Sequence, residues 1–295
     1  MPKPAPLPEP LPSSGFTVAE ARRHGVSRSR MRAGDLSAPF HSVRATAEVS
    51  GVQARATAYA ARMQRTQFFS HTTAAVLHGL RMPEGFRETD LHVTSMVPTR
   101  APRGAGIAGH QSERATMEMV DGLRVLTAVE TWCQVSATLS LDDLVAMGDG
   151  LVRRRKPLTT LEGLRLAVSR YSGRGCRRLR EAFGLVRAGT DSSRETQLRL
   201  LMLRAGFPEP EVNGLILNSH GAEIAHGDLV FRASRTILEY EGRHHSENAL
   251  QFAIDISRLD ELMEEGWRVI RVDRTLMARR ATLLDKVDRA LRAGS

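Results

Sequence analysis

Three acidic side chains occur close together in two short segments, and together they could bind a metal ion. Asp228 precedes the apolar run Leu229–Phe231, and Glu239 and Glu241 fall at the end of the run Thr236–Tyr240. Both runs are rich in β-branched and aromatic residues, which predicts two paired strands joined by a short turn. Side chains alternate along a strand, so Glu239 and Glu241 are expected on one face. Clustered carboxylates repel one another unless a cation lies between them, and Mg²⁺ or Mn²⁺ prefers such oxygen ligands. The other interpretation is a pair of exposed strands that carry solvated acids.

The residues that follow Glu241 add a histidine to this arrangement. Gly242 permits a sharp exit from the strand, and His245 comes shortly after it. Imidazole titrates near neutral pH, so this side chain would suit an acid or base acting on a phosphodiester. A segment with helical spacing then runs over residues 247–265 and stops at Gly266, before a strand-like run over residues 267–272.

A capped helix precedes the acidic segments. Ser192 has the type and position of an N-cap, Glu195 is the acidic residue of the first turn, and Gly206 ends the apolar pattern. The predicted order over this part of the chain is therefore helix, strand, strand, strand, helix, strand, helix.

These residues, in this order and spacing over residues 190–292, resemble the domain-of-unknown-function 559 (DUF559) family. This family is related to the very-short-patch-repair endonucleases of the PD-(D/E)xK superfamily. The resemblance is carried by Glu195, by Asp228, by Glu239-Tyr-Glu241-Gly-x-x-His245, by Asp255-x-x-Arg258 and by Gly266-Trp-Arg-Val-Ile270. It implies a restriction-endonuclease-like mixed sheet flanked by helices, which hydrolyses phosphodiester bonds in DNA with Mg²⁺ or Mn²⁺.

The same resemblance implies roles for individual residues. Asp228 and Glu239 would be the metal ligands, Glu195 an assisting acid, and His245 a neighbour of the scissile phosphate. Many members of the superfamily carry a lysine two residues after the second acid, whereas this chain has Glu241 there. Water would then be activated by a second metal ion or by His245. The alternative is a non-catalytic DNA-binding antitoxin or transcriptional repressor that keeps a degenerate nuclease fold.

The N-terminal part predicts a DNA-binding unit. Residues 1–14 are dominated by proline and alanine and are expected to be a disordered leader. Within residues 15–50, Thr17 caps a helix that closes at Gly25, and a second short helix is expected over residues 26–34, followed by the strands of a wing within residues 36–44. The second helix would present three arginines to duplex DNA: Arg28, Arg30 and Arg32. A helical hairpin with a solvated basic face is the other interpretation. This stretch resembles the winged-helix region of AbiEi-type antitoxins.

The middle region, residues 51–185, is predicted to be a mixed α/β segment with less readable chemistry. Ser70-His-Thr-Thr-Ala-Ala-Val-Leu-His-Gly-Leu80 extends the antitoxin resemblance, and strands are expected near residues 91–94 and 109–111. Four histidines occur here, at positions 71, 78, 92 and 110. They lack the tight spacing of known metal motifs, so ordinary packing is expected for them. The basic clusters at residues 153–156 and 174–180 could contact the DNA backbone, or be solvated charge runs.

Composition is consistent with a nucleic-acid partner and indicates no other class. Lys and Arg number 42 against 33 Asp and Glu, a net charge of +9. Arginine predominates, which suits phosphate contacts and equally a GC-rich genome. Two separated cysteines suggest neither a disulfide framework nor a zinc site. With no signal-like start and no long apolar run, a cytoplasmic protein without membrane association is expected. Double-stranded DNA is the expected partner, RNA remains open, and a homodimer would suit a double-strand cutter.

Overall fold

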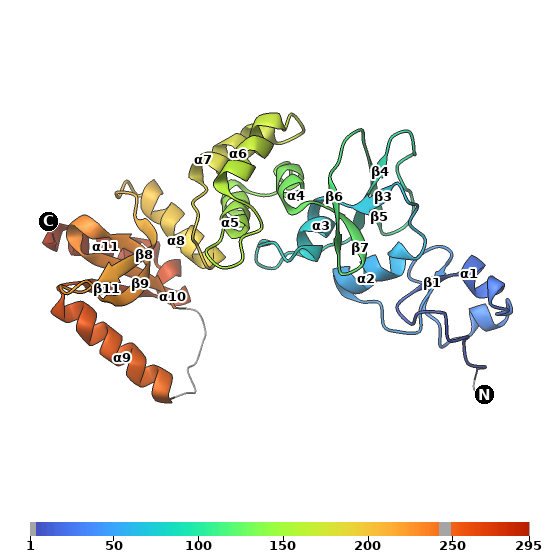
Figure 1. Ribbon diagram of the computed structural model, residues 1–295, viewed down its shortest axis with the longest axis horizontal. Helices are drawn as coiled ribbons and strands as arrows, with labels where there is room; N and C mark the ends of the chain where they lie inside the picture. The colour runs from blue at the N-terminus through green and yellow to red at the C-terminus, as the bar shows by residue number, and fades with distance from the viewer. Residues whose placement is uncertain (1–3, 242–248, 295) are drawn as a thin grey trace. The chain divides into compact units, whose positions relative to one another are not determined.

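The computed structural model describes residues 4–241 and 249–294, and for residues 249–255 it describes the backbone alone. The fold is mixed α/β, of the α+β type, as predicted (Figure 1). The chain forms two compact units. Unit 1 comprises residues 1–139 and 166–179, and unit 2 comprises residues 140–165 and 180–295. The N-terminal and middle regions thus share a unit, and residues 140–165 belong with the C-terminal region.

Unit 1 is built around a five-stranded sheet with the order β5-β4-β3-β7-β6. Its strands and helices are β1 (Phe16–Thr17), α1 (Val18–Arg23), η1 (Arg30–Arg32), β2 (Val43–Arg44), α2 (Gly51–Ala60), β3 (Gln67–Phe69), α3 (His71–Leu77), β4 (Leu91–Met96), β5 (Ile107–Ser112), β6 (Met117–Val120), β7 (Leu123–Leu126) and α4 (Ala128–Val135). Strands β4 and β5 are parallel, and β3 pairs with β4 in the antiparallel direction and with β7 in the parallel direction. The two predicted strands near residues 91–94 and 109–111 are confirmed as parts of β4 and β5.

The N-terminal region differs from the expected winged helix-turn-helix. The first helix is confirmed, because Thr17 accepts a hydrogen bond from the Glu20 N–H and caps α1. The second helix was wrong: η1 is a single 3₁₀ turn. It is short because only one of its residues, Met31, is buried, which is too little apolar surface to hold a longer helix in place. The expected wing strands are reduced to one antiparallel bridge between Ser37 and Ala45, and β2 pairs instead with β1, the strand before α1.

The leader was expected to be disordered, but its described part packs on this region. Leu11 is 8% exposed, and Leu7 packs against the same cluster as Phe16 and Met31. The apolar side chains between the prolines supply enough buried surface to order the segment.

Unit 2 contains a four-stranded sheet with the order β11-β10-β9-β8. Its elements are α5 (Leu141–Leu151), α8 (Ser193–Arg204), β8 (Glu211–Leu217), β9 (Glu223–Phe231), η2 (Arg232–Ser234), β10 (Thr236–Tyr240), α9 (Ala249–Glu264), β11 (Arg268–Val272), α10 (Arg274–Ala278) and α11 (Arg280–Ala293). The helices α6 (Leu161–Arg170) and α7 (Cys176–Leu185) contribute residues to both units. The predicted order of helices and strands is confirmed, with the last helical segment divided into α10 and α11.

The sheet of unit 2 has helices on both faces (Figure 1). Alternation along β9 and β10 sends Leu229 and Leu238 into the cluster formed with α8 and α11. It sends Val230 and Ile237 to the opposite face, where they pack with Leu262 of α9. Asp228 and Glu239 share the sequence parity of Val230 and Ile237, so they belong to the face that α9 covers.

Within the described ranges, the structure contains no helix of the length and apolar character needed to cross a bilayer.

Candidate functional site

The pairing of β9 with β10 brings Asp228 next to Glu239. The antiparallel register joins Leu229 to Leu238 and Val230 to Ile237, and one further step places Asp228 opposite Glu239. The register is supported by a hydrogen bond, since the backbone N–H of Tyr240 donates to Asp228 Oδ2 at 2.8 Å. Two carboxylates from different strands are therefore held on one face by backbone pairing.

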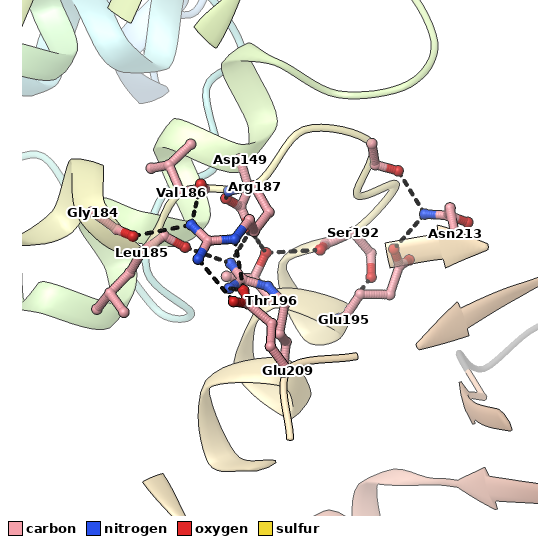
Figure 2. Close-up of polar contacts among 12 residues, drawn as sticks. Asp149, Gly184, Leu185, Val186, Arg187, Ser192, Glu195, Thr196, Glu209 and Asn213 are labelled. Atoms are coloured by element: carbon pink, nitrogen blue, oxygen red, sulfur yellow. Dashed lines mark hydrogen bonds and ion pairs between the residues drawn. The ribbon is translucent and has the colours of Figure 1, made fainter. Parts of the chain in front are cut away.

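Glu195 enters the same region from the first turn of α8. Ser192 caps this helix by accepting from the Glu195 N–H at 3.2 Å. The Glu195 side chain is 6% exposed, and its Oε2 accepts from the Asp191 backbone N–H at 2.8 Å and from Asn213 Nδ2 at 3.3 Å. Asn213 in turn donates to a backbone carbonyl at 2.6 Å, with Glu195 and Asn213 facing each other in Figure 2. Among the residues that the structure describes, only neutral donors hold this carboxylate.

Burial and neighbouring negative charges both disfavour the ionised form of Asp228. Burial raises the pKa of its carboxyl to about 7, and the nearby carboxylates of Glu195, Glu239 and Asp191 add to the rise. The hydrogen bond from Tyr240 opposes the shift and is outweighed. A carboxyl with a pKa near neutrality is costly to ionise, and such groups concentrate at functional sites.

Glu239 is paired with an arginine from the helix that covers this face. Arg258 Nη1 donates to Oε1 at 3.0 Å and Nη2 donates to Oε2 at 3.2 Å, a bidentate contact. The Glu239 side chain is 13% exposed, and Arg258 Nε is buried without a partner among the described residues. This pair gives α9 a fixed position over the sheet. The helical pattern of residues 247–265 could not show that Arg258 faces β10.

Arg154 is a second arginine at this site, from the basic cluster 153–156. It pairs with Asp191 at 2.5 Å, and this pairing raises the pKa of its guanidinium, with smaller contributions from Glu195 and Asp228. The sequence left this cluster either as a contact to the DNA backbone or as a solvated charge run, and did not place it near the acids. Asp191 and Glu239 thus each have an arginine. Among the described residues no ion pair joins Asp228 or Glu195 to a lysine or arginine, so two carboxylates stay unbalanced.

A buried ionic network fixes the helix that carries Glu195. Asp149 of α5 and Arg199 of α8 are both fully buried and form an ion pair at 2.9 Å. Asp149 also accepts from Thr196 Oγ1 at 2.8 Å and from the Arg187 backbone N–H at 2.7 Å (Figure 2). Burial of the carboxyl raises its pKa, and these donors oppose the rise. Because the network joins α5 to α8, it sets the position from which Glu195 reaches the sheet.

The remaining residues that the sequence predicts for the site lie in different places. Glu241 is exposed and pairs with Arg271 at 3.1 Å, so the structure places it outside the buried carboxylates. His245 lies outside the described residues. Of the arginines expected to contact DNA, Arg28 and Arg32 are exposed, whereas Arg30 is held by its own chain through a bidentate pair with Asp35.

Three of the four middle-region histidines come together in unit 1, a proximity that the sequence does not predict. His71, His92 and His110 offer ligand atoms that all lie within 4.8 Å of one another. Their separation in sequence hid this cluster. His78 is apart from it and has a structural partner, the Leu126 carbonyl at 2.7 Å from Nε2.

Comparison with known proteins finds distant relatives. No family model matches the chain. Two proteins of Mycobacterium tuberculosis, described as "Uncharacterized protein MT2308" (strain CDC 1551 / Oshkosh) and "Uncharacterized protein Rv2248" (strain ATCC 25618 / H37Rv), are each 25% identical to it over 202 residues. The alignment covers 68% of this chain and 72% of each relative. These descriptions assign neither an activity nor a ligand to the relatives.

Proposed function

We propose that unit 2 carries a metal-dependent endonuclease site of the PD-(D/E)xK type that acts on double-stranded DNA, with Asp228 and Glu239 as ligands for Mg²⁺ or Mn²⁺. The observation that carries the proposal is the unbalanced negative charge around Asp228. Among the described residues, the buried Glu195 and the partly buried Asp228 have no basic partner, and one divalent cation would match their charge. The order of elements, with acids on β9, β10 and α8, agrees with the topology implied by the DUF559 resemblance.

The spacing of the carboxylates decides how they could hold an ion. The only group of three or more described His, Cys, Asp and Glu residues with ligand atoms mutually within 4.8 Å is the histidine cluster of unit 1. The carboxylate oxygens of unit 2 are therefore further apart than the ligand atoms that surround a bound metal ion. Asp228 Oδ1 nevertheless accepts no hydrogen bond from a described residue, and each oxygen of Glu239 keeps a second lone pair beyond its bond to Arg258. The donors fit a hard cation, provided that the side chains draw together around it.

The residues of the chain then have separate tasks. A bound divalent ion would polarise the scissile phosphate and lower the pKa of a bound water. Asp228 and Glu239 would hold it, and Glu195, fixed by neutral donors, would orient the water. Arg154 and Arg258 would neutralise phosphate charge beside the acids. His245 and Glu241 keep the roles that the sequence suggests, a base near the phosphate and an outer acid that tunes the site.

A cleavage assay tests this function. Supercoiled plasmid and short DNA duplexes would be incubated with wild type, Asp228→Asn and Glu223→Gln in Mg²⁺, Mn²⁺ or EDTA, with binding scored separately by fluorescence anisotropy. Glu223 is the matched control, an exposed acid on the same strand β9. Metal-dependent nicking by wild type and Glu223→Gln, absent in Asp228→Asn with binding kept, supports the proposal. Equal nicking by all three would refute the assigned site.

The second candidate function is a non-catalytic DNA-binding antitoxin or repressor, and one contact favours it. Arg258 already supplies a permanent cation to Glu239, and the lysine expected two residues further on is replaced by Glu241. A protein of this kind would bind duplex DNA equally in Mg²⁺ and EDTA and would cut neither DNA nor a matched RNA duplex. Binding by Asp228→Asn would then equal that of wild type under every condition.

A further inference from the structure

Strand pairing and a helix start bring three histidines together in unit 1. In the parallel pair β4–β5, His110 lies opposite Thr94 and Ala108 opposite His92. His92 and His110 therefore project from the same face of adjacent strands, two residues out of register. His71 is the first residue of α3, directly after Ser70, whose N–H donates to the His92 carbonyl at 3.1 Å.

The rings are in direct contact. His92 Nδ1 lies 2.9 Å from His110 Nε2, the ring centroids of His71 and His110 are 4.0 Å apart, and those of His71 and His92 are 5.3 Å apart. In a tetrahedral zinc site, two nitrogens at about 2.0–2.1 Å from the ion are roughly 3.3 Å apart. A modest opening of the His92–His110 contact, with a turn of the His71 ring, would direct all three to one ion.

The nitrogens that do not face the cluster have oriented partners. Ser70 Oγ lies 2.9 Å from His71 Nδ1, and Thr94 Oγ1 donates to Ser70 Oγ at 2.7 Å. Glu88 Oε1 lies 3.5 Å from His92 Nε2, opposite the nitrogen that faces His110. These contacts leave Nε2 of His71 and Nδ1 of His92 for the ion. A carboxylate behind a ligand histidine is the usual outer arrangement of a zinc site.

Glu88 is itself an unusual group. Its side chain is 4% exposed, Oε1 accepts from Thr72 Oγ1 at 2.8 Å, and Oε2 is buried without a hydrogen bond from a described residue. Burial raises the pKa of this carboxyl. A nearby divalent ion would add to the positive charge that Arg55 supplies to this buried group.

The imidazoles are also kept in the form that binds metals. Burial lowers the pKa of His71 to about 3, with the neighbouring rings adding to the effect, and burial lowers the pKa of His92 and His110 as well. His71 adopts a φ of 51°, a left-handed conformation that side chains rarely take, and its N–H donates to Gln134 Oε1 at 3.1 Å. The surrounding structure thus holds His71 at the cluster against local strain.

We propose that His71, His92 and His110 form a binding site for one divalent transition-metal ion, Zn²⁺ in the first instance, with Glu88 as the carboxylate that orients His92. Three imidazoles favour zinc, cobalt or nickel over magnesium, which prefers oxygen. Three protein ligands leave a fourth position open for water or another small ligand. This site is separate from the carboxylates of unit 2 and does not depend on the function proposed for them.

A cobalt and zinc titration of the full chain tests the site. After treatment with EDTA and its removal, wild type would be titrated with Co²⁺, followed by visible absorption, and with Zn²⁺, followed by calorimetry. We expect one equivalent with a dissociation constant at or below the micromolar range. His110→Gln and His92→Gln should lose that equivalent, and His24→Asn, which alters an exposed histidine of the same unit, should keep it.

Glu88→Gln keeps all three ligands and separates ion binding from folding. Loss of the outer carboxylate should weaken Co²⁺ binding by about 10- to 100-fold without a change in stoichiometry. Circular dichroism would confirm that each variant is folded. If either histidine variant fails to fold, the Co²⁺ affinity of Glu88→Gln tests the proposal in its place. The proposal is overturned if wild type takes up no ion at micromolar concentration, if folded histidine variants bind as wild type does, or if Glu88→Gln leaves the affinity unchanged.

Discussion

Asp228→Asn should make the protein more stable at alkaline pH when no metal is present. The folded pKa of Asp228 is about 7, against an ordinary value of 3.8. Between these values the native state keeps a proton that the unfolded state loses, so stability falls as pH rises from about 4 to about 7. A difference of about 3 pKa units at about 1.4 kcal/mol each gives a loss of about 4 kcal/mol above pH 7. Asparagine does not ionise and avoids this loss.

The assay is urea unfolding in EDTA at pH 4, 5, 6, 7 and 8, followed by tryptophan fluorescence. Trp267 packs beside Ile237 and Leu262 and reports on unit 2. We expect the stability of Asp228→Asn relative to wild type to be near zero at pH 4 and to rise by about 1.4 kcal/mol per pH unit to a plateau above pH 7. Glu223→Gln, an exposed acid of β9, should show no such slope. A flat difference between wild type and Asp228→Asn would refute the assignment of a strained, unbalanced carboxyl.

Magnesium should reduce this difference in stability, because it should stabilise wild type alone. An ion at ten times its dissociation constant stabilises the folded state by about 1.4 kcal/mol, and this gain requires the ligand. Wild type at pH 8 should therefore gain stability in Mg²⁺, and Asp228→Asn should gain none. Equal gains would place the ion elsewhere.

Three further outcomes are expected from burial and packing. Iodoacetamide should label Cys176 in the folded chain and Cys133 only after unfolding, because Cys133 is buried and burial raises the pKa of its thiol to about 12. Peptide mass spectrometry would measure the labelling, and equal labelling of the two cysteines in the folded chain would contradict this prediction. Asp149→Asn should lower the free energy of unfolding by about 3–5 kcal/mol in urea, because it removes the buried charge partner of the fully buried Arg199 and leaves only the more exposed Glu209 at 4.0 Å. A loss under about 1 kcal/mol would count against the network. Gly109→Ala should lower the Tm of unit 1 and weaken Co²⁺ binding, because a Cβ there would lie 1.8 Å from a backbone carbonyl oxygen. Gly34 has open space around its Cβ position, so Gly34→Ala should leave both the Tm and the Co²⁺ affinity nearly unchanged.

The sequence predicts the acidic site because its determinants are local. The alternation of Ile237 and Glu239 along one strand, and the short connection back to Asp228, fix which side chains share a face. The cap at Ser192 likewise fixes where Glu195 falls in its helix. These features depend on a few neighbouring residues, so they can be inferred without the tertiary structure.

The histidine cluster could not be predicted in the same way. His71, His92 and His110 meet only because β4 and β5 pair in parallel and α3 begins at the end of β3. The register of a parallel pairing is not fixed by a tight turn between the two strands, so it depends on packing against other parts of the chain. The pairing of Arg258 with Glu239 is hidden for the same reason, since it depends on how α9 lies over the sheet.

The two candidate sites differ in ligand chemistry, and this difference provides a joint test. Carboxylate oxygens around Asp228 suit Mg²⁺, whereas the imidazole nitrogens of His92 and His110 suit Zn²⁺ or Co²⁺. Asp228→Asn should therefore leave the Co²⁺ stoichiometry unchanged, and His110→Gln should leave the Mg²⁺-dependent stabilisation of unit 2 unchanged. Loss of Co²⁺ binding in Asp228→Asn would mean that the acids supply the ligands, and the histidine cluster would then be a packed group without a metal. If the double variant Asp228→Asn, His110→Gln loses both Co²⁺ binding and the stabilisation by Mg²⁺, and each single variant loses only one of them, the chain holds two independent ions.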